Sequence, residues 1–277
     1  MPELPEVELV ARSLQSLIAR RQIVRAEVFR PKLTPGISSA EFKKLLEGRS
    51  IEKVSRRGKY IVTTLDQNTT LMTHLRMSGR FGYLPADRDL PKFTHAIFHL
   101  DNDMRLIFAD QRHFGMMKVV RTNEMEDSKE LSKLGPEPLG DGFTTKYLRA
   151  SMLAGRKTIK EFLLDQSRLV GLGNIYAAEA LFFARICPTT LAAKLSKVRI
   201  ERLRQAILEI LRSSISHGST LRIDPENIDG SYYGGGFEQQ WAVYDREDEP
   251  CHVCNSPITR ITQGGRSTYF CRKCQRS

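Results

Sequence analysis

The sequence has little of what membrane or secreted proteins usually carry. No stretch approaches the roughly 18 consecutive apolar residues that span a bilayer, so we expect no transmembrane helix. The first residues, MPELPEVELV, lack a basic segment followed by an apolar core, so we expect no signal peptide and a cytoplasmic location. Cysteine is scarce, with five residues in 277, and in a reducing compartment such cysteines serve as ligands more often than as disulfides. Tryptophan occurs once.

Basic residues, by contrast, are in excess. Lys and Arg number 43 against 32 Asp and Glu, which leaves a net charge of +11. An excess of this size favours a polyanionic partner, because each neutralised phosphate releases condensed counterions. The alternative is a basic, solvated surface with no such partner. Charge alone does not separate the two.

Hydrophobic periodicity changes twice along the chain. Residues 3–20 have helical spacing, whereas 22–120 hold short β-rich runs such as YIVTTL, HAIFHL, RLIFAD and MMKVV, separated by turns. The Pro/Gly-rich stretch 134–143 predicts a hinge. Helices are expected near 145–154, 157–166, 174–185 and 196–216, followed by a long aperiodic loop over 218–240. The predicted domains are an N-terminal β-sandwich at 1–133, a helical domain at 144–240 and a small cysteine module at 241–277.

Four of the five cysteines have the spacing of a metal site. Cys251 and Cys254 form one CxxC pair, and after sixteen residues Cys271 and Cys274 form another. Four thiolates suit one structural Zn²⁺ with no open coordination position. The alternatives are unrelated cysteines or a redox pair. Thr268-Tyr269-Phe270 and the Gly264-Gly265 turn favour a β-hairpin zinc ribbon, and Cys187 is left over as a small buried residue.

The N-terminal residues include groups that could carry out catalysis. Removal of Met1 would expose the secondary amine of Pro2, and free α-amines titrate near pH 8, so a useful fraction is nucleophilic at neutral pH. An amine that attacks a sugar C1′ displaces the base and forms a cationic iminium, which is an electron sink. Glu3 and Glu6 supply carboxyl groups for proton transfer. The alternative is that Pro and Glu simply begin a helix.

Several motifs together make the sequence similar to one family of DNA repair enzymes. The start MPELPEVE resembles formamidopyrimidine-DNA glycosylases, and the related endonuclease VIII branch typically begins PEGPE instead. The resemblance continues, in the family's order, through RRGKY (56–60), HLRMSG (74–79), DQRHFG (110–115), LGPEPL (134–139), GLGNIYAAEALF (171–182), GST (218–220), VYDREDEPC (243–251) and the ribbon ending GGRSTYFCRKC.

The resemblance implies an α+β fold: a β-sandwich with an N-terminal helix, then a helix–two-turns–helix domain that ends in a zinc ribbon. It implies that Pro2 is the nucleophile, Glu3 the general acid/base and Glu6 a supporting carboxylate, with Lys59 linked to β-elimination and Arg266 to δ-elimination. Met77, Arg112 and Phe114 resemble the residues that fill the space left by an extruded base. The remaining implied DNA contacts are His74, His95, Arg156, Lys160, Asn174 and Tyr244.

The implied activity is a bifunctional DNA glycosylase and abasic-site lyase. It would excise 8-oxoguanine and formamidopyrimidines from double-stranded DNA and cleave the strand by β,δ-elimination through a Schiff base on Pro2. We expect a nucleoid-associated monomer with one structural Zn²⁺ and no other cofactor. Three positions depart from the family's usual pattern: Phe93, Gly155 and Ser78.

Three other functions remain open from the residues. An endonuclease VIII-like enzyme would act on oxidised pyrimidines. A non-catalytic DNA-damage binder would use the same DNA contacts but would not need Pro2, Glu3 and Lys59. A zinc-ribbon transcription or scaffold protein would not need the PELPE start.

Overall fold

The computed structural model describes residues 1–153, 155–218 and 241–276, so most of the loop predicted at 218–240 lies outside the described residues. The described chain packs mainly as two compact units: unit 1 contains Met1–Ser132, and unit 2 contains Lys133–His217 and residues 241–276. The finer domain boundaries given above stay predictions. No helix in the described ranges is both long and apolar enough to cross a membrane.

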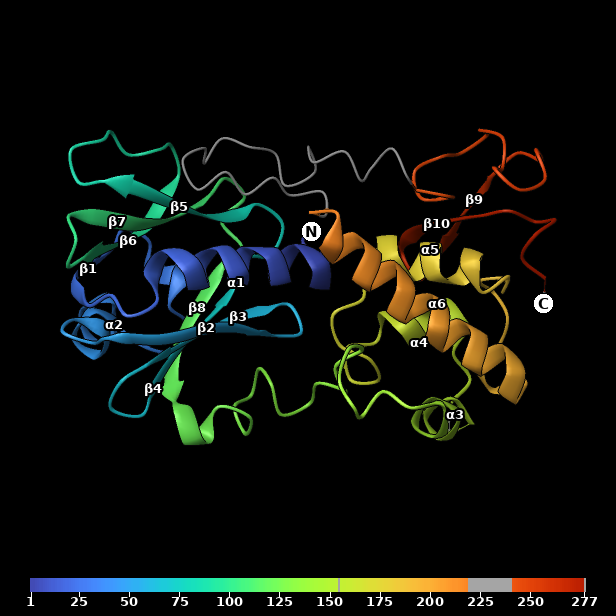
Figure 1. The fold of residues 1–277 in the computed structure, drawn as a ribbon, viewed down its shortest axis with the longest axis horizontal. Helices are drawn as coiled ribbons and strands as arrows, with labels where there is room; N and C mark the ends of the chain where they lie inside the picture. The colour runs from blue at the N-terminus through green and yellow to red at the C-terminus, as the bar shows by residue number, and fades with distance from the viewer. Residues whose placement is uncertain (154, 219–240, 277) are drawn as a thin grey trace. The chain divides into compact units, whose positions relative to one another are not determined.

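Unit 1 is an antiparallel β-sandwich with helices at its side (Figure 1). One sheet has the strand order β1-β6-β7-β5 and the other β2-β3-β4-β8. A single apolar core includes Phe98 and Phe108 of the first sheet together with Ile61 and Leu71 of the second. The elements are α1 (Leu4–Ile18), β1 (Ile23–Val28), α2 (Ser39–Leu46), β2 (Ile51–Arg57), β3 (Tyr60–Leu65), β4 (Thr69–His74), β5 (Gly79–Pro85), β6 (Thr94–Leu100), β7 (Met104–Asp110) and β8 (Met116–Arg121).

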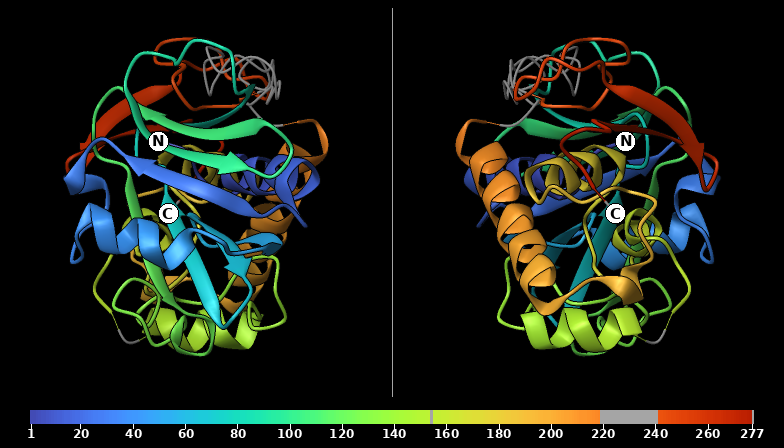
Figure 2. Two further views of the ribbon diagram at one scale, coloured as in Figure 1. Left: turned by 90° about the vertical axis from the view of Figure 1, so that its left-hand side faces the viewer. Right: turned by 90° about the vertical axis from the view of Figure 1, so that its right-hand side faces the viewer.

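Helix α1 follows from its apolar spacing and contributes Val7, Val10 and Leu14 to the core. It packs on β2 and β3. Helix α2, which faces the viewer in the left view of Figure 2, is missing from the sequence prediction. Its signal was present: the Ser38 hydroxyl accepts a hydrogen bond from the Glu41 N–H, as a helix N-cap does.

The strand register of the second sheet determines which residues lie together at one end of the sandwich. Tyr60 pairs with His74, and His74 in turn pairs with Met116. Because paired residues lie side by side, the β2–β3 turn with Lys59, the end of β4 and the segment before β8 share one end of this sheet. In the other sheet Asp110 pairs with Gly79. The motifs RRGKY, HLRMSG and DQRHFG are therefore built around strand ends.

Unit 2 consists of helices and a two-stranded hairpin. Helix α6 packs against α5 and α3 (Figure 2, right), and the Tyr176 hydroxyl on α5 hydrogen-bonds Ser214 on α6 at 2.6 Å. Gly264 and Gly265 both have positive φ, the conformation of a two-residue hairpin turn. The elements are α3 (Thr145–Leu153), α4 (Ile159–Leu164), α5 (Asn174–Phe183), α6 (Lys197–Ser216), β9 (Thr259–Gln263) and β10 (Arg266–Phe270). The predicted fold class is confirmed.

Candidate active site and metal centre

The start of α1 is buried and internally bonded. Pro2, Glu3 and Glu6 are all buried, and the backbone N–H of Glu3 donates to Glu6 Oε2 at 2.8 Å. This is half of a capping box, in which the Glu6 carboxylate also sits where the helix dipole favours negative charge. Pro5 lies in the first helical turn, where its missing N–H costs nothing. The sequence therefore holds two carboxylates beside the chain's terminal amine.

That amine lies in an unusual electrostatic environment. Burial lowers the pKa of the Met1 amine, the carboxylates of Glu3 and Glu6 oppose the shift, and the charges of Lys59 and Arg112 add to it. Four residues singled out from the sequence thus act on one amine within unit 1. A lowered pKa leaves more of an amine unprotonated at neutral pH, which is the form that attacks carbon.

His74 lies beside the buried Lys59 and is itself buried. Its Nδ1 accepts a hydrogen bond from the Arg76 N–H at 3.0 Å, and its ring meets Tyr60 edge-on at 4.7 Å. Burial, with the charges of Arg76 and Lys59, lowers the pKa of His74 to about 3. The neutral ring then carries its proton on Nε2, so it is an uncharged donor at physiological pH.

We expect His74 to stay unprotonated between pH 8 and pH 5. In that window the unfolded chain takes up a proton near pH 6.5 while the folded chain does not, so stability falls as pH falls. The slope from one such group is at most about 1.4 kcal/mol per pH unit. NMR of the ring, assigned with His74→Gln, checks this, and urea unfolding should show a shallower acid loss for the variant. A His74 midpoint above pH 5 would contradict it.

The three void-filling candidates lie on two neighbouring turns. The side chains of Met77 and Phe114 are 40% and 56% exposed. The Arg112 guanidinium lies over the Phe114 ring at 5.5 Å. The Ser78 hydroxyl hydrogen-bonds the Asp110 carboxylate and joins the two turns.

Asp110 is a site residue that the sequence reading did not assign, although its motif was noted. Its buried carboxylate accepts from the Arg112 N–H at 3.2 Å and from the Gly115 N–H at 2.6 Å. The motifs HLRMSG and DQRHFG both need glycine at their last position, since a Cβ on Gly79 or Gly115 would lie under 3 Å from the ring of Phe108. The two turns that carry the exposed side chains are therefore supported by the buried Asp110 carboxylate and the Phe108 ring.

His95 is buried, and this bears on the DNA contact that the resemblance implies. Its Nε2 lies 2.8 Å from the Asp110 carbonyl oxygen and 2.9 Å from His113 Nδ1. Phe93, which departs from the family's usual pattern, is half exposed, and its ring centroid lies 6.1 Å from that of His113 in an edge-on arrangement. These contacts argue that His95 supports the 110–115 turn.

In unit 2, three candidates lie at the turn end of the β9–β10 hairpin. Lys160 Nζ donates to the Ser267 carbonyl at 2.8 Å and to the Thr268 hydroxyl at 2.6 Å, and Asn174 Nδ2 donates to the same carbonyl at 3.0 Å. Arg266, next in sequence to Ser267, is exposed. Lys160 is 1% exposed, which argues for positioning Arg266 instead of the direct DNA contact implied by the resemblance. Arg156 is exposed ahead of α4.

Tyr244 is held by a buried carboxylate that sequence reasoning missed. Glu179 on α5 accepts hydrogen bonds from the N–H groups of Ala242, Val243 and Tyr244 at 2.8–2.9 Å. Burial raises the pKa of Glu179, and the three N–H donors oppose that shift. The Tyr244 ring stacks edge-on with Trp241 and Tyr269. The glutamate lay inside the motif GLGNIYAAEALF, but only the fold shows its partners.

Glu179→Gln should lower the free energy of unfolding of the segment that Glu179 holds by about 2 kcal/mol. The glutamine NH₂ would face a buried N–H that has lost its acceptor. Trp241, the single tryptophan, adjoins the anchored segment and reports on it by fluorescence during urea unfolding. Glu209→Gln, on an exposed position of α6, is the control and should leave the midpoint unchanged. Equal midpoints for the two variants would refute the role of Glu179.

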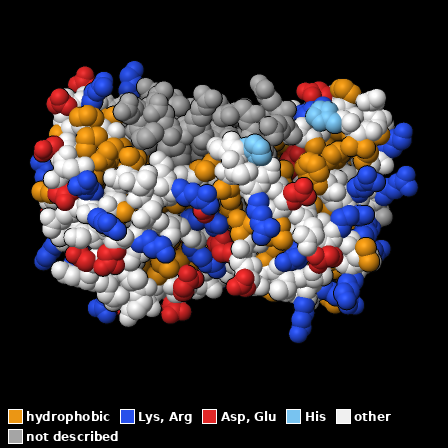
Figure 3. All heavy atoms as spheres, in the orientation of Figure 1, with side chains coloured by type: hydrophobic (Ala, Val, Ile, Leu, Met, Phe, Trp, Pro, Cys, Tyr) orange, Lys and Arg blue, Asp and Glu red, His pale blue; other side chains and the backbone are white. Residues whose placement is uncertain are grey.

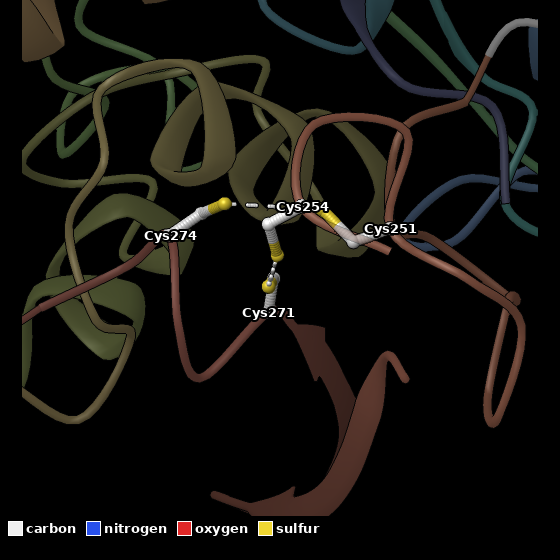
Figure 4. Close-up of side chains that lie close together, drawn as sticks. All are labelled: Cys251, Cys254, Cys271 and Cys274. Carbon is white, nitrogen blue, oxygen red and sulfur yellow. Dashed lines mark hydrogen bonds between the residues drawn. The ribbon is translucent and has the colours of Figure 1, made fainter. Parts of the chain in front are cut away.

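The four cysteines converge as a metal centre (Figure 4). Their sulfur atoms lie within 4.8 Å of one another, with Cys254–Cys271 at 3.4 Å and Cys251–Cys274 at 3.9 Å. Tetrahedral Zn–S bonds of 2.3 Å require sulfurs about 3.8 Å apart, so the donor set fits zinc.

The ionisation of these thiols also fits a metal. Hydrogen bonds from Ser256 lower the pKa of Cys254 to about 6, whereas burial and then the neighbouring sulfurs raise the pKa of Cys274 to about 12. Four crowded thiolates therefore need a cation among them. Four-sulfur coordination leaves no open position, so the zinc is structural.

Comparison with known proteins covers almost the whole chain. Residues 1–117 match the formamidopyrimidine-DNA glycosylase N-terminal domain, residues 134–224 the H2TH domain of the same enzymes, and residues 248–276 a zinc finger found in FPG and IleRS. The formamidopyrimidine-DNA glycosylase of Desulforamulus reducens is 43% identical, over 100% of both chains. That of Pelotomaculum thermopropionicum is 42% identical, over 100% of this chain and 99% of the relative.

Solved structures of Lactococcus lactis Fpg are also similar. Its complex with DNA containing N7-benzyl-Fapy-dG has a TM-score of 0.91 at 34% identity, with 100% of both chains covered. Its complex with abasic-site DNA has a TM-score of 0.91 at 33% identity, covering 99% of this chain and 100% of that one. A further complex of the same protein, with DNA containing an oxidized pyrimidine, has a TM-score of 0.90 at 33% identity over 100% of both chains.

Proposed function

Because the chain belongs to the formamidopyrimidine-DNA glycosylase family of DNA repair enzymes, we propose that it excises oxidised purines from duplex DNA and then cleaves the strand. The substrates are 8-oxoguanine and formamidopyrimidine nucleotides. The observation that carries this proposal is the buried start of the chain, where Pro2 and Glu3 lie in unit 1 and the Glu3 N–H donates to the Glu6 carboxylate. A non-catalytic binder would gain nothing from that arrangement.

The chemistry begins once Met1 has been removed. The Pro2 nitrogen bonds to C1′ of the damaged nucleotide, the glycosidic bond breaks, and the base leaves with a proton. Glu3, buried next to Pro2, is the group that moves protons at the sugar. Opening of the sugar ring gives a cationic Pro2 iminium, the Schiff base.

Strand cleavage follows from the iminium as an electron sink. Loss of the C2′ proton expels the 3′ phosphate in β-elimination, and a second elimination expels the 5′ phosphate. We assign Lys59, which is buried in the β2–β3 turn, to the first of these steps. Arg266, exposed at the start of β10, is assigned to the second. Water then releases Pro2.

DNA contacts are proposed from both units. Met77 and Phe114 fill the space of the extruded nucleotide, and Arg112 hydrogen-bonds the orphaned base. His74 donates to a phosphate as a neutral ring, and Asn174 does so at the start of α5, where helix N–H groups attract anions. Arg156 and Tyr244 complete the phosphate contacts. We propose Lys160 and His95 as positioning residues, for the reasons of burial given above.

A second candidate substrate is an oxidised pyrimidine. The observation in its favour is the complex of Lactococcus lactis Fpg with DNA containing one. Release of base and nicking of the strand, measured on 8-oxoguanine:cytosine, thymine glycol:adenine and abasic duplexes, tests both candidates. We expect the fastest excision on 8-oxoguanine and strand cleavage on all three. Faster excision of thymine glycol would favour the pyrimidine substrate, and binding without cleavage of any duplex would exclude the proposed enzyme.

The remaining assignments are that the protein acts as a monomer at the nucleoid in the cytoplasm. Light scattering of the protein alone and with one duplex tests the first. Fluorescence imaging of the tagged protein tests the second.

A further inference from the structure

A basic pocket lies in unit 2 beside the zinc centre. It has a volume of about 590 Å³ and is lined by five cationic side chains, those of Arg185, Arg199, Arg202, Lys273 and Arg276, together with Cys254 and Cys274. The proposed excision chemistry uses none of these cations. In Figure 3, Lys and Arg side chains gather on the side of unit 2 where Figure 1 places the beginning of α6 and the C-terminus.

Backbone and side-chain hydrogen bonds fix the segments that line this pocket. The segment after the last cysteine is pinned to the α5–α6 connection, since the Cys187 N–H donates to the Arg276 carbonyl at 3.1 Å and Gln275 Nε2 donates to the Ile186 carbonyl at 2.9 Å. Arg199 Nη2 also donates to the Arg276 carbonyl, at 2.6 Å. The basic side chains therefore project from elements that cannot easily move apart.

No acidic residue lines the pocket, and none of its five cations forms a salt bridge with another residue of the described chain. Burial, followed by the charge of Arg202, lowers the pKa of Arg199, as happens where cations crowd together. A zinc ion with four thiolates carries a charge of about −2, which is smaller than the charge of five cations. The pocket keeps a net positive charge with the metal bound.

The pocket is separate from the DNA contacts proposed for the hairpin. Arg266 stands at the first residue of β10, whereas Cys271 and the second knuckle follow its last residue. Five residues of extended chain span roughly 17 Å, so a phosphate on Arg266 does not reach the pocket. Arginine, which supplies four of the five cations, pairs with phosphate through two parallel hydrogen bonds.

We propose that this pocket is a second anion site that binds the phosphate groups of a polyphosphate chain or of a nucleic-acid strand. A single phosphate would occupy a small part of its volume and pair with few of its cations. A chain of linked phosphates spans several of them at once. The site does not depend on the proposed excision chemistry.

The test compares two double variants of the zinc-loaded full chain. Arg185→Gln with Arg202→Gln removes two charges from the pocket, and Lys44→Gln with Arg212→Gln removes two exposed charges elsewhere. Calorimetry with tripolyphosphate measures one source of phosphate, and anisotropy with labelled oligothymidylate over a range of salt measures the other. Zinc content and thermal melts show that both variants fold.

For tripolyphosphate we expect the pocket variant to bind about tenfold or more weakly than the control variant, and the control to match the unchanged protein. For oligothymidylate the pocket variant should also show a smaller salt dependence than the control. A deficit with tripolyphosphate alone assigns the site to free polyphosphate, and a deficit with the strand assigns it to nucleic acid. Equal binding by the two variants for both probes overturns the proposal.

Discussion

Pro2→Gly is expected to reduce borohydride-trapped complex on an 8-oxoguanine:cytosine duplex by about 100-fold, a rise of about 2.7 kcal/mol in the activation barrier. Proline is a secondary amine, so its adduct with C1′ is a permanently charged iminium. Glycine is a primary amine, whose imine needs a further proton before it withdraws electrons. Glycine also loses the ring that orders the buried start of the chain. Peptide mapping of the trapped complex should place the sugar on residue 2.

Glu3→Gln is the informative companion variant. It leaves the Pro2 amine intact but removes a buried carboxyl group beside it. We expect it to lose base excision from 8-oxoguanine while still being trapped on a duplex that already contains an abasic site. A trapped sugar that maps to Lys59 in the unchanged protein would show that another amine is the nucleophile.

The second large effect is expected from Cys271→Ser. Cys271 is fully buried, and its loss leaves three sulfur ligands, so zinc content should fall from one ion per chain to near zero. The β9–β10 hairpin has too small a core to fold alone. Its release would take the Ser267 carbonyl away from Lys160 and Asn174 and displace Arg266. We expect strand cleavage to fall by at least about 100-fold.

Cys187→Ser is the matched control. Cys187 is buried, outside the four-sulfur group, and its sulfur lies 3.2 Å from the Thr189 hydroxyl. It should keep its zinc and its activity. Hydrogen exchange of residues 259–270 measures the hairpin directly, and unit 1 should keep its protection in both variants. A Cys271→Ser protein that retains both zinc and a protected hairpin would show that the cysteines are not what holds this module together.

Much of this protein is readable from local patterns. The run YIVTTL is strand β3 over its full length, and the Gly264-Gly265 pair is the hairpin turn, because strands and tight turns follow from a few adjacent residues. The CxxC spacing indicated the metal centre, since a knuckle is a local structure. Helix α2 was missed, although Ser38 and Glu41 carried the N-cap pattern, because its eight residues give a short periodic signal.

The sequence by itself determined the chemical groups available: Pro2 beside two carboxylates, and four cysteines with the spacing of a zinc site. Only the tertiary structure decided which polar groups face inward. Lys160 meets Ser267 across 107 residues and Glu179 meets Ala242 across 63, distances over which no periodicity carries information. Burial follows from which segments pack together, and a buried charge requires partners that the fold alone can bring to it. For that reason we propose Lys160 as a support for the hairpin and leave direct DNA contact to exposed residues such as Arg266.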